Sequence, residues 1–152
     1  MSTLLAVSRP SEWNFPLFVH VLGAMILVGG LLAGASLLLY ARGDARSLRL
    51  GYWTLLLVAF PGYIVMRIGA QWTYSKEGLE DLPEDPTWIG IGFAVADIGA
   101  LLVLIALILG GIGVRRLRSG GGTGLLKAAM VIAWVVLAAA LVAVWAMAGK
   151  PD

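Results

Sequence analysis

Residues 16–40 read PLFVHVLGAMILVGGLLAGASLLLY, a stretch that contains no lysine, arginine, aspartate or glutamate and a single histidine, His20. A helix needs about 20 mainly apolar residues to cross the roughly 30 Å hydrocarbon core of a bilayer. The run exceeds that length. It is also longer than the apolar part of a cleavable signal peptide, which has about 7–15 residues. We therefore predict that residues 16–40 form a helix that spans a membrane.

Three more apolar runs follow the first, over residues 50–74, 87–113 and 125–148. Each is long enough to cross a bilayer. Each must be helical, because a lone strand in lipid would leave its backbone hydrogen-bonding groups unpaired. We predict an all-α, polytopic membrane protein, a four-transmembrane-helix up-down bundle that forms a single membrane domain over residues 1–152. The triplet Phe60-Pro61-Gly62 predicts a kink in the second span.

The composition excludes several classes of function. Hydrophobic residues make up 60% of the chain and charged residues 13%, so nearly all of its mass belongs in the bilayer. The absence of cysteine excludes disulfides, zinc–thiolate sites and iron–sulfur clusters. The glycine-rich residues 119–124 lack the spacing of a phosphate-binding loop and are typical of a flexible linker. With a net charge of only +2, the chain has no basic patch for nucleic acid, and its expected partner is lipid.

Basic side chains predict the orientation of the bundle. Seven of them belong to the first connection, to the third connection or to the start of the fourth span, and three lie on the opposite side. The seven are Arg42, Arg46, Arg49, Arg115, Arg116, Arg118 and Lys127. The side of a membrane protein that is richer in lysine and arginine faces the cytoplasm. We therefore predict an N-out/C-out topology. The excess of arginine over lysine, beside abundant alanine and glycine, suggests a GC-rich bacterium and hence a bacterial inner membrane protein.

Three ionisable side chains lie inside the predicted spans: His20, Arg67 and Asp97. A charge in the hydrocarbon region is costly, so such residues are candidates for a functional site. A helix rises about 1.5 Å per residue. Counted from the outer end of each span, all three residues fall at similar depth in the outer half of the bilayer. We therefore expect them to contribute to an outward-half polar pocket.

The second span carries a polar stripe on one helical face. Tyr63, Arg67, Gln71 and Tyr74 recur at i, i+4, i+8 and i+11. The natural partner of Arg67 is Asp97, because a guanidinium and a carboxylate on neighbouring helices can pair through two hydrogen bonds. The pair has two interpretations: it fixes the register of the helices, or it forms a site for an anion or a proton.

His20 also has two interpretations. It is either a neutral histidine held by one hydrogen bond or a ligand of haem or of a metal. Since the chain has one histidine, a haem with two histidine ligands would need a homo-oligomer. Met25 and Met66 are possible soft ligands for copper(I). Gly23 and its neighbour Ala24 leave room beside the imidazole for a flat ligand, but ordinary helix packing explains them equally well.

Small residues recur at a spacing of four in the first, third and fourth spans. They are Gly30 and Gly34, then Gly92, Ala96 and Ala100, then Ala129 and Ala133. Such rows let helices approach closely in lipid. We interpret them as packing within the bundle rather than as a dedicated dimer face.

Residues 16–30, PLFVHVLGAMILVGG, resemble the first helix of small bacterial membrane families. These include copper-resistance membrane proteins of the CopD type and haem-linked protoporphyrinogen oxidases of the HemJ type. The resemblance implies that His20 is a ligand of haem or copper. The HemJ type also uses a lysine in a later helix, and residues 50–74 and 87–113 contain none.

These observations favour a binding or redox module linked to haem or a metal. His20 would be the axial or metal ligand, Arg67 an anion or propionate anchor and Asp97 its counter-charge. Tyr63, Gln71 and Tyr74 would line the mouth of the pocket. Two alternatives remain: a non-catalytic accessory or scaffold subunit, and a small-solute permease that acts as an oligomer. An enzyme is not favoured, because no hydrolase or phosphoryl-transfer set of residues is present.

Overall fold

The computed structural model describes residues 11–81, 83–84 and 86–149. Its helices, in chain order, are η1 (Ser11–Trp13), α1 (Asn14–Tyr40), α2 (Ala45–Thr54), η2 (Leu55–Ala59), α3 (Phe60–Lys76), η3 (Leu79–Asp81), α4 (Thr87–Arg118) and α5 (Gly124–Gly149). The elements η1 and η3 are short 3-10 turns. The element η2 is a π-helical segment that joins α2 to α3.

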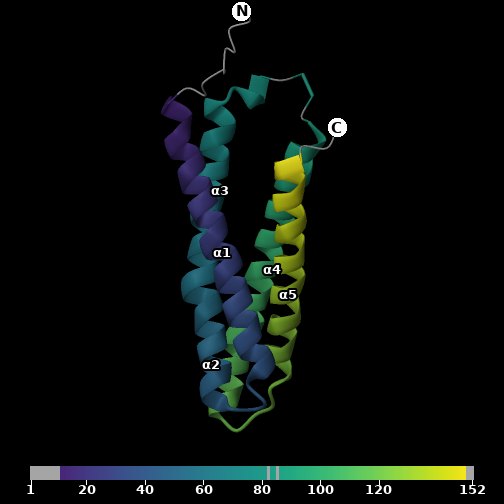
Figure 1. The fold of residues 1–152 in the computed structure, drawn as a ribbon. Coiled ribbons are helices and arrows are strands. Elements are labelled where there is room, and N and C mark those ends of the chain that lie inside the picture. The colour runs from purple at the N-terminus through teal and green to yellow at the C-terminus, as the bar shows by residue number, and fades with distance from the viewer. Residues whose placement is uncertain (1–10, 82, 85, 150–152) are drawn as a thin grey trace, which may run out of the picture.

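Within the described residues, four helical stretches are long and apolar enough to cross a membrane. They are Ser11–Tyr40, Ala45–Lys76, Thr87–Arg118 and Gly124–Gly149. Each contains one of the four ranges expected from the sequence, so the prediction of an all-α chain with four candidate spans is confirmed. The ribbons run alternately in opposite directions (Figure 1), as in an up-down bundle.

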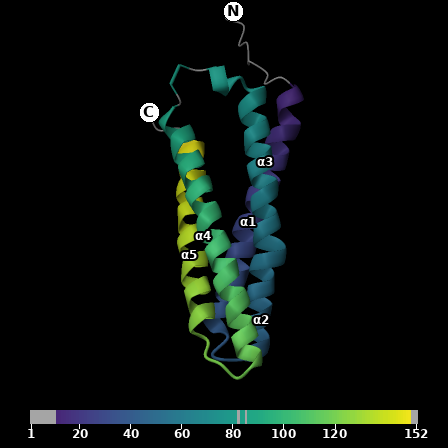
Figure 2. The same cartoon turned by 180° about the vertical axis from the view of Figure 1, so that it is seen from behind.

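The bundle has two chemically different ends (Figures 1 and 2). The start of α1, the end of α5 and the turn η3 lie at one end, called here the terminal end. The loops 41–44 and 119–123 lie at the opposite end, called here the basic end. Its basic residues are Arg42, Arg46, Arg49, Arg115, Arg116, Arg118 and Lys127. The chain therefore concentrates positive charge at one end of four apolar helices.

Asp44 begins α2 at the basic end. Its Oδ2 accepts hydrogen bonds from the Ser47 hydroxyl at 2.6 Å and from the Ser47 backbone N–H at 2.7 Å. Aspartate is a preferred residue at this position, because its side chain satisfies a backbone donor that has no partner within the helix. The same two bonds stabilise the ionised carboxylate and hold the pKa of the exposed Asp44 below its ordinary value.

The helix α1 packs backbone to backbone against the helix formed by α2, η2 and α3. A Cβ added to Gly30 would lie 2.6 Å from the nitrogen of Ala59, and one added to Gly34 would lie 2.6 Å from the side chain of Leu55. Real Cβ atoms essentially never approach within 3.0 Å of another heavy atom. The pair Gly30 and Gly34 therefore serves packing inside the bundle, as the sequence predicted.

The second long helix widens at η2, which ends two residues before Pro61. The backbone N–H of Phe60 donates to the carbonyl of Leu55, five residues earlier instead of four. Proline has no N–H, and its ring crowds the carbonyl four residues before it. The sequence predicted a kink at Pro61. Next to this proline the structure has a π-helical turn, within a helix that continues from Ala45 to Lys76.

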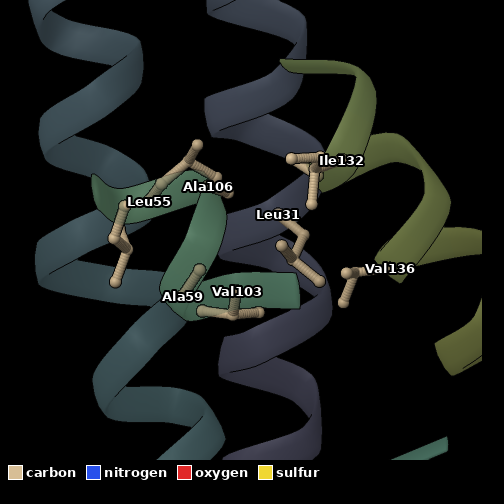
Figure 3. A pocket seen from close by; sticks show the side chains of 9 residues that line it. Leu31, Leu55, Ala59, Val103, Ala106, Ile132 and Val136 are labelled. Carbon is tan, nitrogen blue, oxygen red and sulfur yellow. The ribbon is translucent and has the colours of Figure 1, made fainter. Parts of the chain in front are cut away.

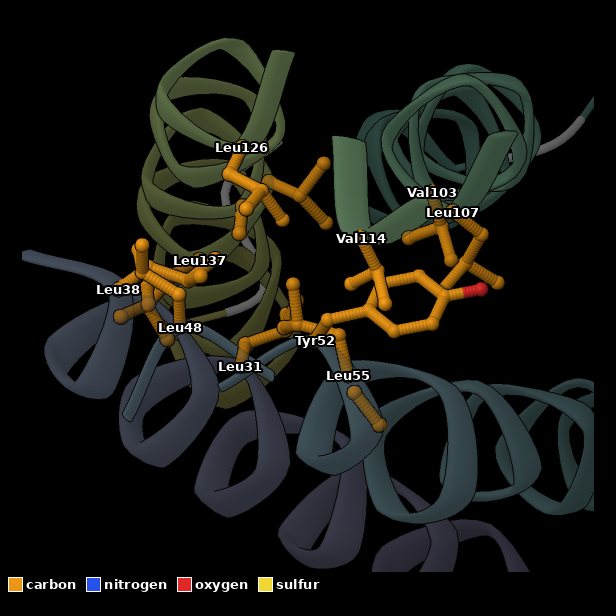
Figure 4. Packing of buried hydrophobic residues seen from close by; sticks show 14 of the residues in the cluster. Leu31, Leu38, Leu48, Tyr52, Leu55, Val103, Leu107, Val114, Leu126 and Leu137 are labelled. Carbon is orange, nitrogen blue, oxygen red and sulfur yellow. The ribbon is translucent and has the colours of Figure 1, made fainter. Parts of the chain in front are cut away.

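The buried core occupies the middle of the bundle and its basic half. Figure 4 shows how its side chains pack together. Leu31 of α1 and Leu126 of α5 are almost completely buried. Tyr52 of α2 covers Gly110 of α4, where an added Cβ would lie 2.6 Å from the tyrosine ring. This contact joins α2 to α4, so the ring of helices is closed on this side of the bundle.

A small cavity of about 10 Å³ lies within this core (Figure 3). It is lined by Leu31, Leu55, Ala59, Val103, Ala106, Leu107, Ile132, Ala133 and Val136. A buried water needs about 10–15 Å³ and several polar partners. Since every lining side chain is apolar, the cavity is a gap in the packing, and it is too small for a solute or a cofactor.

Toward the terminal end, the two helix pairs diverge (Figures 1 and 2). The helix α1 packs extensively against α3 and also against α5, and α4 packs extensively against α5. By contrast, α3 and α4 make few backbone-level contacts. The ring of helices is therefore held together between α3 and α4 mainly by side chains that reach across from one helix to the other.

Candidate functional site

The side chains that bridge α3 and α4 include most of the polar residues that the sequence singled out. We call this contact the α3–α4 seam. It is formed by Tyr63, Arg67 and Tyr74 of α3 and by Phe93, Ala96 and Asp97 of α4. Nη2 of Arg67 donates a hydrogen bond of 3.0 Å to Oδ1 of Asp97. The structure thus shows the expected Arg67–Asp97 pair, but joined by one hydrogen bond rather than by two.

Aromatic side chains support this ion pair. The guanidinium carbon of Arg67 lies 5.0 Å from the centre of the Phe93 ring, within the range of a cation–π interaction. Tyr74 packs edge-on against the same ring, with a distance of 5.2 Å between the ring centres. Phe93 is therefore held between Arg67 and Tyr74, and it fixes where the guanidinium lies.

Tyr63 provides a second polar bridge between the helices. Its hydroxyl donates to the backbone carbonyl of Ala96 at 3.2 Å. A phenol in an apolar environment needs such a partner, because a polar group left unpaired there costs free energy. Tyr63 therefore ties α3 to α4 one helical turn from Arg67.

The hydrogen-bonding capacity of the ion pair is not exhausted. Nη1 of Arg67 is buried and has no hydrogen-bond partner among the described residues. The side chain of Arg67 is 31% exposed and that of Asp97 is 65% exposed. A buried donor without an acceptor costs about 1–3 kcal/mol, and more when it is charged. The carboxylate of Asp97 is thus accessible from outside the bundle, and the guanidinium of Arg67 lacks one hydrogen-bond acceptor.

Two features of the seam differ from the sequence interpretation. Gln71 shares the predicted stripe, but its side chain is exposed and makes no hydrogen bond within the described part of the chain. Phe93 was not singled out, although it lies one turn before Asp97 and therefore on the same side of α4. An aromatic residue one turn from an acid inside a predicted span is the sequence signal that would have identified Phe93.

His20 lies on a different contact, between α1 and α3. Its Nδ1 lies 3.0 Å from the carbonyl oxygen of Met66. Because a carbonyl oxygen can only accept, this hydrogen bond requires the proton on Nδ1, and a neutral imidazole then has a free lone pair on Nε2. The backbone of His20 faces Gly69, so the histidine lies at nearly the same level as Arg67.

The space expected beside His20 is filled by protein. A Cβ added to Gly23 would collide with the backbone of Met66, so Gly23 admits the neighbouring helix and leaves no room there for a flat ligand. Of the two methionines considered as ligands, Met66 packs against the apolar core and Met25 is 68% exposed. The described residues contain no group of three or more histidine, cysteine, aspartate or glutamate side chains placed to hold a metal ion.

The structure therefore separates two features that the sequence had placed in one pocket. Arg67 and Tyr63 reach α4 from one face of α3, whereas the carbonyl of Met66 and Gly69 meet α1 on another face. His20 and the Arg67–Asp97 pair lie at a similar level along the bundle, but no hydrogen bond or ion pair joins His20 to Arg67 or Asp97 among the described residues.

No protein-family model matches the chain, and no curated protein or solved structure is significantly similar to it. The geometry of the α3–α4 seam and of His20 therefore carries the functional argument.

Proposed function

We propose that this chain is a multi-pass protein of the bacterial inner membrane and that it acts as a non-catalytic binding module. In this proposal, Arg67 in the α3–α4 seam holds the anionic group of a ligand. The observation that carries the proposal is the buried Nη1 of Arg67, which has no acceptor among the described residues. An oxyanion that accepts from this donor would complete the hydrogen bonding of the guanidinium.

The proposed topology is N-out/C-out. It is supported by the seven basic residues of the basic end, which would face the cytoplasm. The terminal end would then face outward, and the α3–α4 seam would lie in the outer half of the bilayer. A charged pair at that depth normally faces the interior of a bundle or a hydrated space, and here it remains open on the Asp97 side.

The seam offers a chemically coherent site for an oxyanion. A small separation of α3 from α4 would expose Nη1, and few backbone contacts between these helices oppose it. Phe93 would keep the guanidinium plane in place during binding. Tyr74 and Gln71 lie farther toward the terminal end, on the path by which a ligand would approach. Phosphate suits such a site, because arginine matches the geometry of its oxygens.

The proposal is tested by the melting temperature of the protein in an uncharged detergent. The probe is a phosphate group, supplied either as inorganic phosphate or as a short-chain phospholipid. Since a ligand that binds the folded state stabilises it, we expect at least one form to raise the melting temperature of the parent and not that of Arg67→Gln. The matched control Lys76→Gln removes the same charge from the end of α3 and should respond like the parent. An equal response of Arg67→Gln would refute the proposal.

A second candidate function is the binding of haem or a metal at His20. It is favoured by the hydrogen bond from Nδ1 to the Met66 carbonyl, which leaves Nε2 free to bind a metal, as in many metal-binding histidines. The resemblance of residues 16–30 to the first helix of CopD-type and HemJ-type proteins supports the same role. Because one chain supplies one histidine, the second ligand would come from another copy or from a different residue type.

The second candidate is tested by the visible absorption spectrum and metal content of protein purified from a haem-replete host. A Soret band or stoichiometric copper that is absent from His20→Ala would establish the ligand. A colourless, metal-free parent that is stably folded would exclude it.

A further inference from the structure

We propose that the ligand of the α3–α4 seam is a zwitterionic phospholipid of the outer leaflet, with its phosphate at Arg67 and its primary ammonium at Asp97. This inference rests on the proposed function and names the class of its ligand. It is argued from the charge, the unused hydrogen-bonding atoms and the depth of the seam.

The charge of the seam distinguishes a zwitterion from a simple anion. Nη2 of Arg67 lies 3.0 Å from Oδ1 of Asp97, so the two side chains together form a neutral unit with a positive and a negative side. A ligand with a net negative charge would be attracted by Arg67 but repelled by Asp97 at almost the same distance. A ligand that carries a phosphate and an ammonium meets both charges with the opposite sign. The neutral pair therefore selects a neutral ligand with separated charges.

The hydrogen-bonding atoms that the ion pair leaves unused also favour a zwitterion. Nη1 of Arg67 is a donor without an acceptor, and Oδ2 of Asp97 makes no hydrogen bond within the described ranges. A phosphate supplies acceptors for the first, and a primary ammonium supplies three N–H donors for the second. The quaternary ammonium of phosphocholine has no N–H to donate. The seam therefore matches phosphoethanolamine better than phosphocholine.

The depth of the seam places it within reach of a headgroup. The helix Ala45–Lys76 has 32 residues and is about 48 Å long, roughly 18 Å more than the hydrocarbon core. If it extends equally at both ends, about 9 Å of it lies outside the core on each side. Arg67 lies nine residues, or about 14 Å, before the end of α3. The seam is thus about 5 Å inside the core, a depth from which a long arginine side chain reaches the interface.

The surroundings of the seam suit the rest of a lipid molecule. Residues adjacent to the ion pair are large, apolar and exposed: Ile68 on α3 is 57% exposed and Ile98 on α4 is 61% exposed. Acyl chains can pack along these side chains while the headgroup lies at the ion pair. Since Asp97 is 65% exposed, the ammonium can reach the carboxylate directly from the lipid, and the phosphate reaches Nη1 of Arg67 when α3 and α4 separate slightly.

The inference is tested by lipid selectivity. The parent protein in uncharged detergent is titrated with phosphatidylethanolamine, phosphatidylglycerol and phosphatidylcholine that have identical acyl chains, and binding is measured by native mass spectrometry. We expect the parent to bind phosphatidylethanolamine at least about tenfold more tightly than either other lipid, the ratio expected for one charge-assisted hydrogen bond. The melting temperatures should follow the same order.

The variant Asp97→Asn provides the sharpest comparison. It changes the neutral pair into a site with a net positive charge, so the preference should shift from phosphatidylethanolamine to the anionic phosphatidylglycerol. The control Asp81→Asn removes the same charge from the turn η3 at the terminal end and should keep the preference of the parent. A parent that binds the two lipids equally, or an Asp97→Asn variant whose selectivity is unchanged, would overturn the inference.

The outcomes separate this inference from the proposed function. Binding of both lipids without preference, but lost in Arg67→Gln, would support the anion site and refute the zwitterion. Binding that does not depend on Arg67 would refute both. If Asp97→Asn does not fold, the lipid ranking of the parent decides the question alone.

Discussion

The energetic cost of Arg67 or of Asp97 depends on whether the other charge is present. Either charge alone would be costly in the outer half of a bilayer, and together they form a bridge between two helices that otherwise make few contacts. Their pairing was predictable from depth and helix direction. The single hydrogen bond and the unsatisfied Nη1 were not, because they depend on how far apart the two backbones lie.

The ion pair predicts that the effects of single and double substitutions on stability are not additive. Arg67→Leu leaves the carboxylate unpaired and Asp97→Leu leaves the guanidinium unpaired, so we expect each to lower the free energy of unfolding by about 1–3 kcal/mol. The double variant removes both charges and should be more stable than either single variant. Chemical denaturation in detergent measures these differences. Gln71→Leu, on the same helical face, should change stability by less than about 0.5 kcal/mol.

The hydrogen bonds of Asp44 predict that the stability of the protein depends on this residue's ionisation only at acidic pH. The hydroxyl and the backbone N–H of Ser47 lower its pKa in the folded state, so its contribution is present above the unfolded pKa of about 3.9. That contribution is lost as the pH falls through the lower pKa of the folded state. We expect Asp44→Ala to melt at a lower temperature than the parent at pH 7 and the difference to shrink below about pH 4. Asp44→Asn, which keeps the cap but does not titrate, should show no such change, and a constant difference in the alanine variant would contradict the assignment.

At the scale of the element, the sequence was most informative where a helix is defined by length and composition. The four spans were predictable for that reason. The π-helical turn at η2 was not, because a proline does not specify whether the turn before it keeps α-helical hydrogen bonds or widens. The separation of His20 from the seam also escaped prediction. The backbone carbonyl of Met66 meets His20 of α1, whereas the side chain of Arg67 meets Asp97 of α4, and only the packing of α1 on α3 decides this.

Adjacent glycines of α1 give a direct test of that packing. An added Cβ at Gly30 would lie 2.6 Å from the Ala59 nitrogen, whereas at Gly29 it would meet no heavy atom within 4 Å. We expect Gly30→Ala to destabilise the protein by about 1–3 kcal/mol through overpacking. Gly29→Ala should be neutral or slightly stabilising, because alanine favours helix more than glycine. Thermal unfolding of the two variants under identical conditions makes the comparison, and equal effects would contradict the close contact.

At the scale of the whole molecule, the prediction is the topology. The chain has no cysteine, so single cysteines can be introduced without a background signal. We expect a membrane-impermeant maleimide to label Glu84→Cys in intact cells and to label Thr123→Cys after the membrane is opened. Glu84 follows η3 at the terminal end and Thr123 precedes α5 at the basic end. The reverse pattern would show that the basic end faces outward.

The pairing of helices also makes the chain modular. Each extensive interface, α1 with α3 and α4 with α5, joins helices that are neighbours in sequence, so each half of the chain is a hairpin that can pack before the other is made. A break at the connection after η3 would leave both hairpins whole. We expect fragments 1–81 and 83–152, produced separately in one cell, to copurify as a complex. The molecule would then be an assembly of two preformed hairpins, with the contact between α1 and α5 as the surface on which they recognise each other.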